Sequence, residues 1–345
     1  MIKKLLWVSG VFSVFFPLSA MACATCGCSL TSDATSDYMS SEGWRVNMEY
    51  DYIDQSQLRT GSSSVSPAQA AQVNYANGDA QEIERRTINR YWNLDATYHP
   101  DASWQFSVLL PYLDRTHGTY GNAYPNQINA AQVSDVSSSG IGDMQLVTGY
   151  QGFLPTHNLG VQLGVKLPTG NYGGQVGASP LVGRNPVMFA TGPNAGGALD
   201  TSLQPGTGST DIIVGAYYYV PVSQNFDAFI TGRYQVAMFE MLDQSGANFR
   251  PGNLGVVSAG LRYEKDPLWT PQLQINFSQK SHDQGALADT TDTAGKVVYL
   301  SPGLSHSISH TTSVYSYLQL PIYSQLQGYQ LFPRWTMALG ASMRF

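Results

Sequence analysis

Hydrophobic and polar residues alternate with a period of two in many separate segments of this chain. In Trp44–Asp54, large apolar side chains occupy every second position, with Arg45, Asn47, Glu49 and Asp51 between them. Successive side chains of a β-strand point to opposite faces, so this pattern predicts a strand with one apolar and one polar face. Such a strand suits the edge of a soluble sandwich, and it also suits a transmembrane barrel whose outer face meets lipid.

The same pattern predicts about twelve strands, an even number, as single-chain bacterial barrels require. The predicted strands are Trp44–Asp54, Thr87–Tyr98, Trp104–Tyr112, Gly142–Tyr150, Leu159–Leu167, Asp211–Val220, Phe226–Ala237, Leu254–Tyr263, Gln272–Ser278, Val297–Leu304, Thr312–Tyr323 and Arg334–Phe345. The last strand alternates up to the final residue. Its terminal aromatic, Phe345, resembles the signal that the barrel-assembly machinery reads in bacterial outer-membrane proteins.

The links between these strands alternate in length. Short turns surround Pro100, Pro155, Ser223, Pro267 and Ser309, and the link around Gln327 is modest. The long links are Gln55–Glu84, Leu113–Gly140, Pro168–Thr210, Met238–Asn253 and Gln279–Lys296. Outer-membrane barrels have short periplasmic turns and long outer loops, whereas a soluble sandwich has no reason to sort its loops. We therefore predict an all-β, closed, antiparallel transmembrane barrel of the outer-membrane type, with both termini in the periplasm.

The longest loop, Gly170–Gly208, is rich in glycine, serine, asparagine and alanine. A loop of this composition usually lies outside the scaffold, and we expect that position here. The alternative is that it folds into the lumen as a constriction.

Composition agrees with a barrel in a Gram-negative membrane. Only 12% of the 345 residues are charged and 43% are hydrophobic, whereas soluble domains average about 25% charged residues. No internal segment has the roughly 18 consecutive apolar residues of a membrane-spanning helix. The chain has a net charge of −6, so it gives no electrostatic support for a nucleic-acid partner.

The N-terminus has the pattern of a secretory signal. Lys3 and Lys4 precede a mostly apolar run, Leu5–Phe16, and Ala20 and Ala22 frame a small-x-small cleavage site. We predict a signal peptide at 1–22, a cysteine-containing periplasmic segment at 23–43, and a transmembrane barrel with long extracellular loops at 44–345.

All three cysteines of the chain lie in the CxxCxC sequence of Cys23, Cys26 and Cys28. Export favours a disulfide, which would leave one thiol over. Closely spaced thiolates also suit a soft ion such as copper, although no histidine nearby completes a zinc site. Lipidation of Cys23 matches poorly, because Ala20 stands where a branched residue is expected. The fourth alternative is a contact with a periplasmic redox or metal protein.

Charged residues at inward positions are the candidates for lining the lumen. They are Arg45, Glu49, Asp51, Asp95, Asp143, Lys166, Asp227, Arg233, Arg334 and Arg344. Inside a barrel such charges either pair across the wall or set the field that a passing solute meets. No catalytic triad, HExxH sequence or phosphate-binding loop is visible, so the sequence predicts no enzyme.

Two adjacent predicted strands carry a more specific pattern. The first begins Gly140-Ile141-Gly142-Asp143-Met144-Gln145-Leu146 and ends at Tyr150, and the second runs from Gly160 to Lys166-Leu167-Pro168-Thr169-Gly170. This resembles the outer-membrane transporter family named after the meta-pathway of phenol degradation, in which a Gly-x-Gly-Asp strand precedes one that ends in Lys-x-Pro-Thr-Gly. The resemblance implies a barrel that takes up small, often hydrophobic molecules. The cysteine-rich head departs from that family.

Three functions follow as hypotheses. The leading one is a porin-like channel for passive transport of small, hydrophobic or aromatic solutes, with outer-membrane lipid, the assembly machinery and the solute as partners. The second is an accessory barrel of a metal-handling or electron-transfer system that uses the cysteine head. The weakest is an outer-membrane enzyme such as a lipase.

Overall fold

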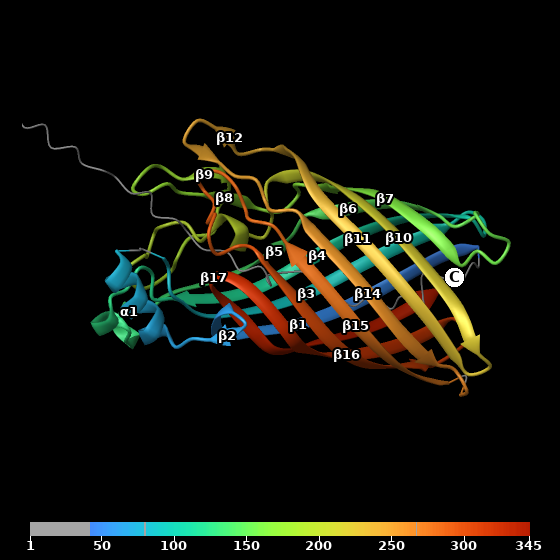
Figure 1. The fold of residues 1–345 in the computed structure, drawn as a ribbon. Coiled ribbons are helices and arrows are strands. Elements are labelled where there is room, and N and C mark those ends of the chain that lie inside the picture. The colour runs from blue at the N-terminus through green and yellow to red at the C-terminus, as the bar shows by residue number, and fades with distance from the viewer. Residues whose placement is uncertain (1–41, 79–80, 267) are drawn as a thin grey trace, which may run out of the picture.

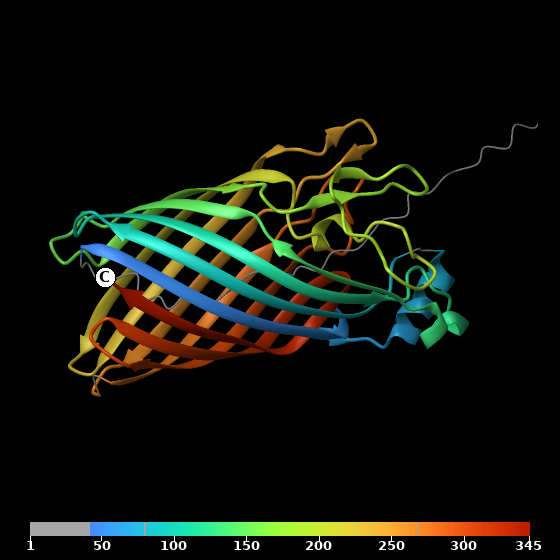
Figure 2. The ribbon, with the colours of Figure 1, turned by 180° about the vertical axis from the view of Figure 1, so that it is seen from behind.

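An antiparallel β-sheet closes on itself to form a barrel in the computed structural model, which describes residues 42–78, 81–266 and 268–345. Figures 1 and 2 show its two sides. Eleven strands form the ring, and the last of them pairs with the first. In ring order they are β1 (Gly43–Gly61), β3 (Glu84–His99), β4 (Trp104–Thr119), β6 (Met144–Tyr150), β7 (Leu159–Leu167), β10 (Ser209–Ser223), β11 (Phe226–Glu240), β14 (Leu254–Tyr263), β15 (Trp269–Lys280), β16 (Gly295–Ser307) and β17 (Thr312–Arg344).

The strand β17 crosses the wall twice. Its first part pairs with β16 as far as Leu326, and its second part pairs with β1 from Leu326 to Arg344. Gly328, which has a left-handed φ of 62°, lies between the two parts. The ring has eleven labelled strands, and β17 supplies two crossings of the wall instead of one. The number of crossings therefore agrees with the predicted number of about twelve.

The fourth crossing is also divided. β5 (Ser134–Ile141) and β6 both pair with β4, and Gly142 and Asp143 interrupt the strand between them. The short strand β2 (Ser63–Ser64) pairs with β1 outside the ring. The sequence did not predict β5, because Ser137, Ser138 and Ser139 weaken its apolar alternation.

The barrel has two unlike ends, and the predicted alternation of links is present. We call the end with Gly43 and Arg344 the terminus end; the short turns lie there. The opposite end, which we call the loop end, carries all the long connections (Figure 1). These contain α1 (Pro67–Asn77), η1 (Pro125–Gln127), η2 (Ala130–Gln132), β8 (Tyr172–Gly174), β9 (Val182–Arg184), η3 (Thr201–Leu203), β12 (Asp243–Gln244) and β13 (Ala247–Asn248).

The helix α1 follows from a local capping signal. The Ser66 hydroxyl accepts from the backbone N–H of Gln69, and the side chain of Gln69 accepts from the backbone N–H of Ser66, which forms a capping box. Pro67 suits the first helical turn. Gly78 ends the helix in a left-handed conformation. No helix in the described ranges is both long and apolar enough to cross a membrane.

The outer wall has the apolar surface and the aromatic girdle of a membrane barrel. At the terminus end, Trp44 packs on Tyr98 and Trp104 on Tyr150, with ring centroids 5.0 and 4.8 Å apart. Nearer the loop end, Tyr52 contacts Trp335 at 5.7 Å. The two rings of each pair come from adjacent strands, so the predicted outward faces meet across the strand boundaries.

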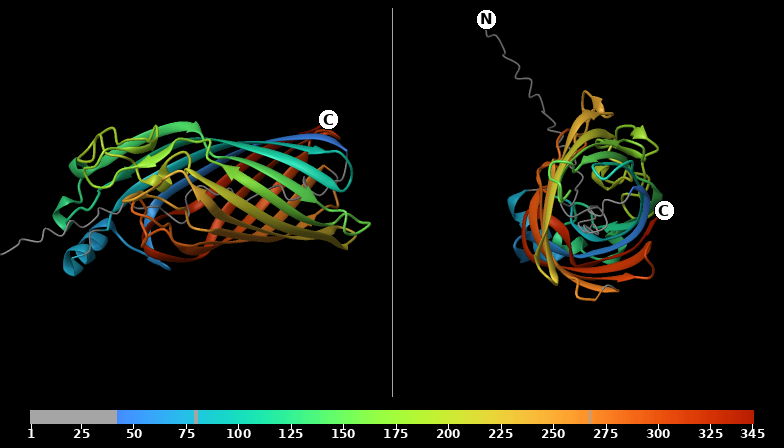
Figure 3. Two further views of the ribbon diagram at one scale, coloured as in Figure 1. Left: turned by 90° about the horizontal axis from the view of Figure 1, so that it is seen from above. Right: turned by 90° about the vertical axis from the view of Figure 1, so that its right-hand side faces the viewer.

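The prediction that the longest loop lies outside the barrel was wrong. Viewed along the barrel from the terminus end, part of the segment between β7 and β10 falls within the outline of the ring (Figure 3), and this segment contacts inward residues of β4 and β5. Phe189, Leu199 and Leu203 pack together with Val136, an inward residue of β5. Burial of these apolar side chains, at 7% exposure or less, favours the folded position over a solvated loop.

Candidate functional site

Three charged side chains form a cluster of ion pairs on the inner wall near the loop end. Lys166 Nζ on β7 lies 2.9 Å from Asp143 Oδ2 and 3.2 Å from Asp211 Oδ2 on β10. All three residues are buried. Ser209 Oγ donates to Asp211 at 2.6 Å and Gln235 Nε2 donates at 2.7 Å. One ammonium group thus faces two carboxylates, and neutral donors compensate for the excess negative charge.

Asp143 also clamps the neck of the β7–β10 loop, which we define as residues 168–208. Its Oδ1 accepts from the backbone N–H of Gly170 at 3.2 Å, and its Oδ2 accepts from the N–H and hydroxyl of Thr207, both at 2.9 Å. A Cβ built on Gly170 would lie 2.9 Å from the Cα of Gly206. The two sides of the neck therefore approach so closely that glycine is required.

The two halves of the sequence pattern noted above meet at this neck. Lys166 lies opposite Gln145 in the pairing of β6 with β7. The hydroxyl of Thr169 donates to the carbonyl of Gly142 at 2.7 Å and accepts from the N–H of Met144 at 2.8 Å. The Gly-Asp and Lys-x-Pro-Thr-Gly elements thus have a physical role, because they close the base of a loop that folds inward.

A second contact holds the loop against the nearby strand β4, which is separated from β7 only by β6. The guanidinium of Arg115 on β4 donates to the carbonyl of Leu203, to Asn89 Oδ1 at 2.5 Å and to the hydroxyl of Tyr91 at 2.9 Å. The ring of Phe189 lies 6.1 Å from that of His117. The β7–β10 loop is thereby tied to the inner face of β4 as well as to its own neck.

Four inward aromatic rings, nearer the terminus end, lie against glycine residues. The contacts are Tyr217 with Gly160, Phe229 with Gly260, Tyr317 with Gly303 and Tyr315 with Gly340. In the first three, the ring and the glycine are direct cross-strand partners. A Cβ on any of these glycines would collide with ring carbons. Because glycine has no Cβ, the rings can lie along the wall. We call these four rings the aromatic belt.

The hydroxyl groups of the aromatic belt are bonded to the wall. Tyr217 donates to Gln151 Oε1 at 2.6 Å and Tyr317 donates to Gln272 Oε1 at 2.7 Å. Tyr315 donates to Glu49 Oε2 at 2.8 Å. The three hydroxyl groups are thus fixed by polar side chains, and all four rings of the belt are buried, at 5% exposure or less.

Most of the predicted lumen-lining charges lie on the inner side of the sheet. Five of them are buried, namely Arg45, Glu49, Asp51, Asp143 and Lys166. Four are half-buried, namely Asp95, Asp227, Arg233 and Arg344. The structure brings Asp143 and Lys166 together, and Arg233 donates to Gln145 on β6. That these charges act on a passing solute stays a prediction.

Arg334 departs from the expected inward position. The register of β17 against β1 shifts here, since Ile53 pairs with Thr336 but Gln55 pairs with Pro333. This bulge breaks the period of two, and Arg334 and Trp335 are both exposed. Arg334 therefore does not join the buried charges of the lumen.

The three cysteines and the predicted segment 23–43, apart from Glu42 and Gly43, lie outside the described residues. Among the residues that are described, no group of three His, Cys, Asp or Glu side chains is placed to hold a metal ion.

Buried carboxylates gather in the loops. Burial raises the pKa of Asp200, at the start of η3, and the neighbouring Glu82, Asp289 and Asp283 raise it further, while the N–H of Ser202 opposes the shift. Burial likewise raises the pKa of Asp289. Asp200 and Asp289 tend to keep their protons because burial disfavours the charged form of a carboxyl group.

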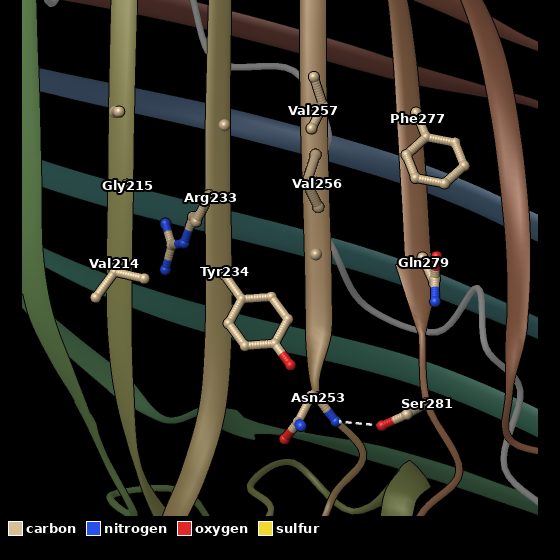
Figure 4. A pocket seen from close by; sticks show the side chains of 13 residues that line it. Val214, Gly215, Arg233, Tyr234, Asn253, Val256, Val257, Phe277, Gln279 and Ser281 are labelled. Carbon is tan, nitrogen blue, oxygen red and sulfur yellow. Dashed lines mark hydrogen bonds between the residues drawn. The ribbon is translucent and has the colours of Figure 1, made fainter.

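A groove of about 640 Å³ lies at β10, β11, β14 and β15 (Figure 4). Exposed Val214, Tyr234 and Val257 line it, and two further lining residues, Gly232 and Gly255, carry no side chain into it. These exposed apolar side chains belong to the outer face of the sheet, and Arg233, one of the predicted lumen charges, also lines the groove.

Sequence reasoning missed several residues of this site. Arg115 and His117 lay in the predicted link Leu113–Gly140, because β4 continues to Thr119. The belt residues Tyr217 and Phe229 were visible as aromatics, but their contacts with glycine depend on strand register. A glycine at an inward position was the one available signal for a close contact.

Comparisons with known proteins agree with this architecture. A family model described as "Putative MetA-pathway of phenol degradation" matches residues 59–327. An outer membrane channel from Pseudomonas putida F1 is 12% identical, with a TM-score of 0.59, and the match covers 91% of this chain and 100% of that one. At an identity this low, the likeness shows a shared fold alone.

Two further solved barrels are more distant. The β domain of the Bordetella autotransporter Brka is 9% identical (TM-score 0.47; 88% of this chain and 100% of that one). The Ralstonia pickettii toluene transporter TbuX is 12% identical (TM-score 0.42; 88% and 90%). A search of curated proteins finds no matching sequence.

Proposed function

The chain belongs to the family of the MetA pathway of phenol degradation, and from this membership and its inner surface we propose that it is a passive outer-membrane channel for small hydrophobic or aromatic solutes. The Pseudomonas putida F1 barrel that shares its fold is an outer membrane channel. No catalytic step belongs to this proposal.

The aromatic belt is the observation that carries the proposal. A pore for ions and sugars needs a wetted polar wall, whereas Phe229 and the tyrosine rings are apolar groups on the inner side of the sheet, each buried at 5% exposure or less. Each ring is held along the wall by a facing glycine, so the belt adds apolar contact area without a side chain across the passage. Such a surface favours solutes with an aromatic or aliphatic body.

The size of the barrel suits a narrow and selective passage. Barrels of about 8 strands are filled by side chains, whereas those of about 16–18 strands leave a wide aqueous channel. A ring of eleven strands, with a loop folded inside it, lies between these cases. We propose that the β7–β10 loop restricts the passage near the loop end.

Proteoliposomes test the channel directly. Purified protein in liposomes is expected to accelerate the entry of toluene or phenol, and planar bilayers are expected to show discrete conductance steps. Folded protein that gives neither result contradicts the proposal.

A loop variant tests the restriction. The N–H of Gly206 donates to the carbonyl of Asn171 at 2.7 Å, so two glycines can replace Tyr172–Pro205 while the neck stays closed. This variant is expected to conduct more than wild type. Replacing Asp243–Asn248, the β12–β13 hairpin outside the ring, in the same way is the control for loss of the cluster that Ala247 shares with Tyr172 and Val176 of the loop, and it is expected to leave conductance unchanged.

We further propose that the terminus end faces the periplasm. Short turns at one end and long loops at the other are typical of barrels inserted in this direction. The assembly machinery and outer-membrane lipid are the partners that this orientation implies, with Phe345 as the recognition signal.

The cysteine head supports a second proposal. Cys23, Cys26 and Cys28 are the only cysteines in the chain, and three thiolates in six residues suit a soft ion such as Cu(I) or a periplasmic redox or metal protein. Metal analysis and thiol counting on the purified mature protein test this. Full oxidation to a disulfide, or a triple Cys→Ser variant that binds copper as wild type does, contradicts a metal role.

A further inference from the structure

Two neighbouring amides on the inner face of β15 have polar atoms without a hydrogen-bond partner. Gln274 Nε2 and Asn276 Oδ1 are shielded from water and have no hydrogen-bond partner among the residues that the structure describes. The two residues are 2% and 0% exposed. Buried polar groups are nearly always paired, because losing water without a replacement is unfavourable. The two atoms are one donor and one acceptor.

Both amides face the lumen. Leu273 and Ile275, the alternate residues of the strand, are 49% and 51% exposed on the outer wall, so Gln274 and Asn276 share the opposite face. The other end of the Asn276 amide is occupied, since its Nδ2 donates to Ser301 Oγ at 2.8 Å. The free donor and the free acceptor are thus neighbours along one inward face.

Aromatic rings surround this polar pair. Gln274 lies opposite Gly260, against which the ring of Phe229 rests. Asn276 lies opposite Tyr299 of β16. Gln272, the next inward residue toward the terminus end, holds the hydroxyl of Tyr317 at 2.7 Å. The two unpaired atoms are therefore a polar spot between carbon surfaces.

We propose that Gln274 and Asn276 form a binding station for a small aromatic or aliphatic solute that carries one hydroxyl group. The hydroxyl oxygen accepts from Gln274 Nε2, the hydroxyl proton is donated to Asn276 Oδ1, and the apolar body contacts the rings of Phe229 and Tyr299. A hydrocarbon leaves both atoms unpaired and binds more weakly. This inference rests on the proposed function, because it assigns a solute preference to the same lumen.

The test compares phenol with toluene, which has a similar ring but no hydroxyl. Titration calorimetry on the full-length protein in detergent is expected to show tighter binding of phenol. Gln274→Met and Asn276→Leu keep the side-chain size and remove the polar atoms. Each is expected to weaken phenol binding roughly 3- to 10-fold, the range for a lost hydrogen bond, and to leave toluene binding unchanged.

Two controls keep the result interpretable. Gln162→Met makes the same change at an inward, half-buried glutamine of β7 and is expected to leave both affinities unchanged. Gln274→Met is also expected to raise the melting temperature without solute, because it removes an unpaired buried donor.

Equal affinity of the wild type for phenol and toluene overturns the station, since the amides then do not recognise a hydroxyl group. Equal loss of both affinities in the variants overturns it as well. Solute entry into liposomes separates this inference from the channel itself. If the protein binds phenol more tightly but passes neither solute, the station is supported and the proposed channel function is contradicted. If it passes both solutes and binds them equally well, the channel function is supported and the station is contradicted.

Discussion

Lys166 is the residue on which the electrostatics of the loop neck depend. Its ammonium group is the common partner of Asp143 and Asp211, at 2.9 and 3.2 Å, and all three residues are buried. Asp143 in turn accepts the backbone N–H groups of Gly170 and Thr207 from the two sides of the neck. Loss of the lysine charge would leave two carboxylates facing each other in a region shielded from water.

We therefore expect Lys166→Met to lower the free energy of unfolding by about 3–5 kcal/mol, the usual cost of removing one partner from a buried ion pair. Adding Asp211→Asn is expected to recover part of that loss. Denaturant unfolding in detergent measures both variants. Arg86→Met is the control, because Arg86 pairs with Asp54 at 2.7 Å on the surface, and the loss there is expected to stay within about 1 kcal/mol. Equal losses of unfolding free energy in Lys166→Met and Arg86→Met contradict the role of Lys166 as the partner of two buried carboxylates.

Asp200 leads to a prediction about pH. Its pKa is raised by burial and by nearby carboxylates, so its contribution to stability is fully present below the unfolded pKa of about 3.9 and is lost as pH rises through the raised value. We expect η3 to exchange amide hydrogens more slowly at acidic pH, after correction for intrinsic rates. Asp200→Asn keeps an acceptor for the N–H of Ser202 but carries no charge at position 200, so the protection of η3 in this variant should change less with pH than in wild type. A wild type whose protection is independent of pH contradicts this account.

At the scale of single elements, facing glycines decide how the belt strands present their rings. Tyr317 lies against Gly303 without any special backbone conformation at the glycine. Gly303→Ala would therefore strain packing rather than backbone. The ring must leave the wall and turn into the lumen.

We expect Gly303→Ala to destabilise the barrel by about 1–3 kcal/mol, as overpacking does, and to reduce conductance in planar bilayers. Tyr317→Ala in the same chain is expected to restore conductance. Gly232→Ala is the matched control, since a Cβ there has nothing within 4 Å, and its effect should stay within about 0.5 kcal/mol. Normal conductance of Gly303→Ala would show that the ring does not set the width of the passage.

The elements also show which features the sequence contains and which it does not. Alternation located the outward faces, because lipid demands apolar side chains at every second position. It stopped short in β1, which continues to Gly61, and it missed β5, because polar residues lie on both faces where a strand leaves the membrane or meets another part of the chain.

The inward fold of the β7–β10 loop could not be predicted from periodicity. It depends on contacts between distant residues, such as Arg115 with Leu203 and Asp143 with Thr207. The Gly-Asp and Lys-x-Pro-Thr-Gly pattern marked the neck but gave no direction for the loop. The unpaired amides of Gln274 and Asn276 likewise emerge only once strand register is known.

At the scale of the whole molecule, the two ends of the barrel predict its direction in the membrane. Ser245, between β12 and β13, and Gln224, between β10 and β11, are exposed at opposite ends. In a chain whose native cysteines are changed to serine, Ser245→Cys is expected to react with a membrane-impermeant maleimide on intact cells. Gln224→Cys is expected to react only after the outer membrane is opened. The reverse pattern would place the terminus end outside.

Closure of the barrel and its assembly meet at Phe345. The N–H of Phe345 donates to the carbonyl of Trp44 at 2.8 Å, and the N–H of Trp44 donates back at 3.3 Å, so the backbone of the last residue completes the ring. Its side chain is 70% exposed and contributes little to packing. Phe345→Ala should therefore leave the stability of refolded protein within about 0.5 kcal/mol, while lowering the amount assembled in the outer membrane of cells. Met343→Ala, at another outward position of β17, is the control and should assemble normally. If both variants assemble equally well, the Phe345 ring is only part of the outer wall and is not an assembly signal. If only Phe345→Ala fails to assemble, the assembly machinery recognises this side chain before the barrel closes.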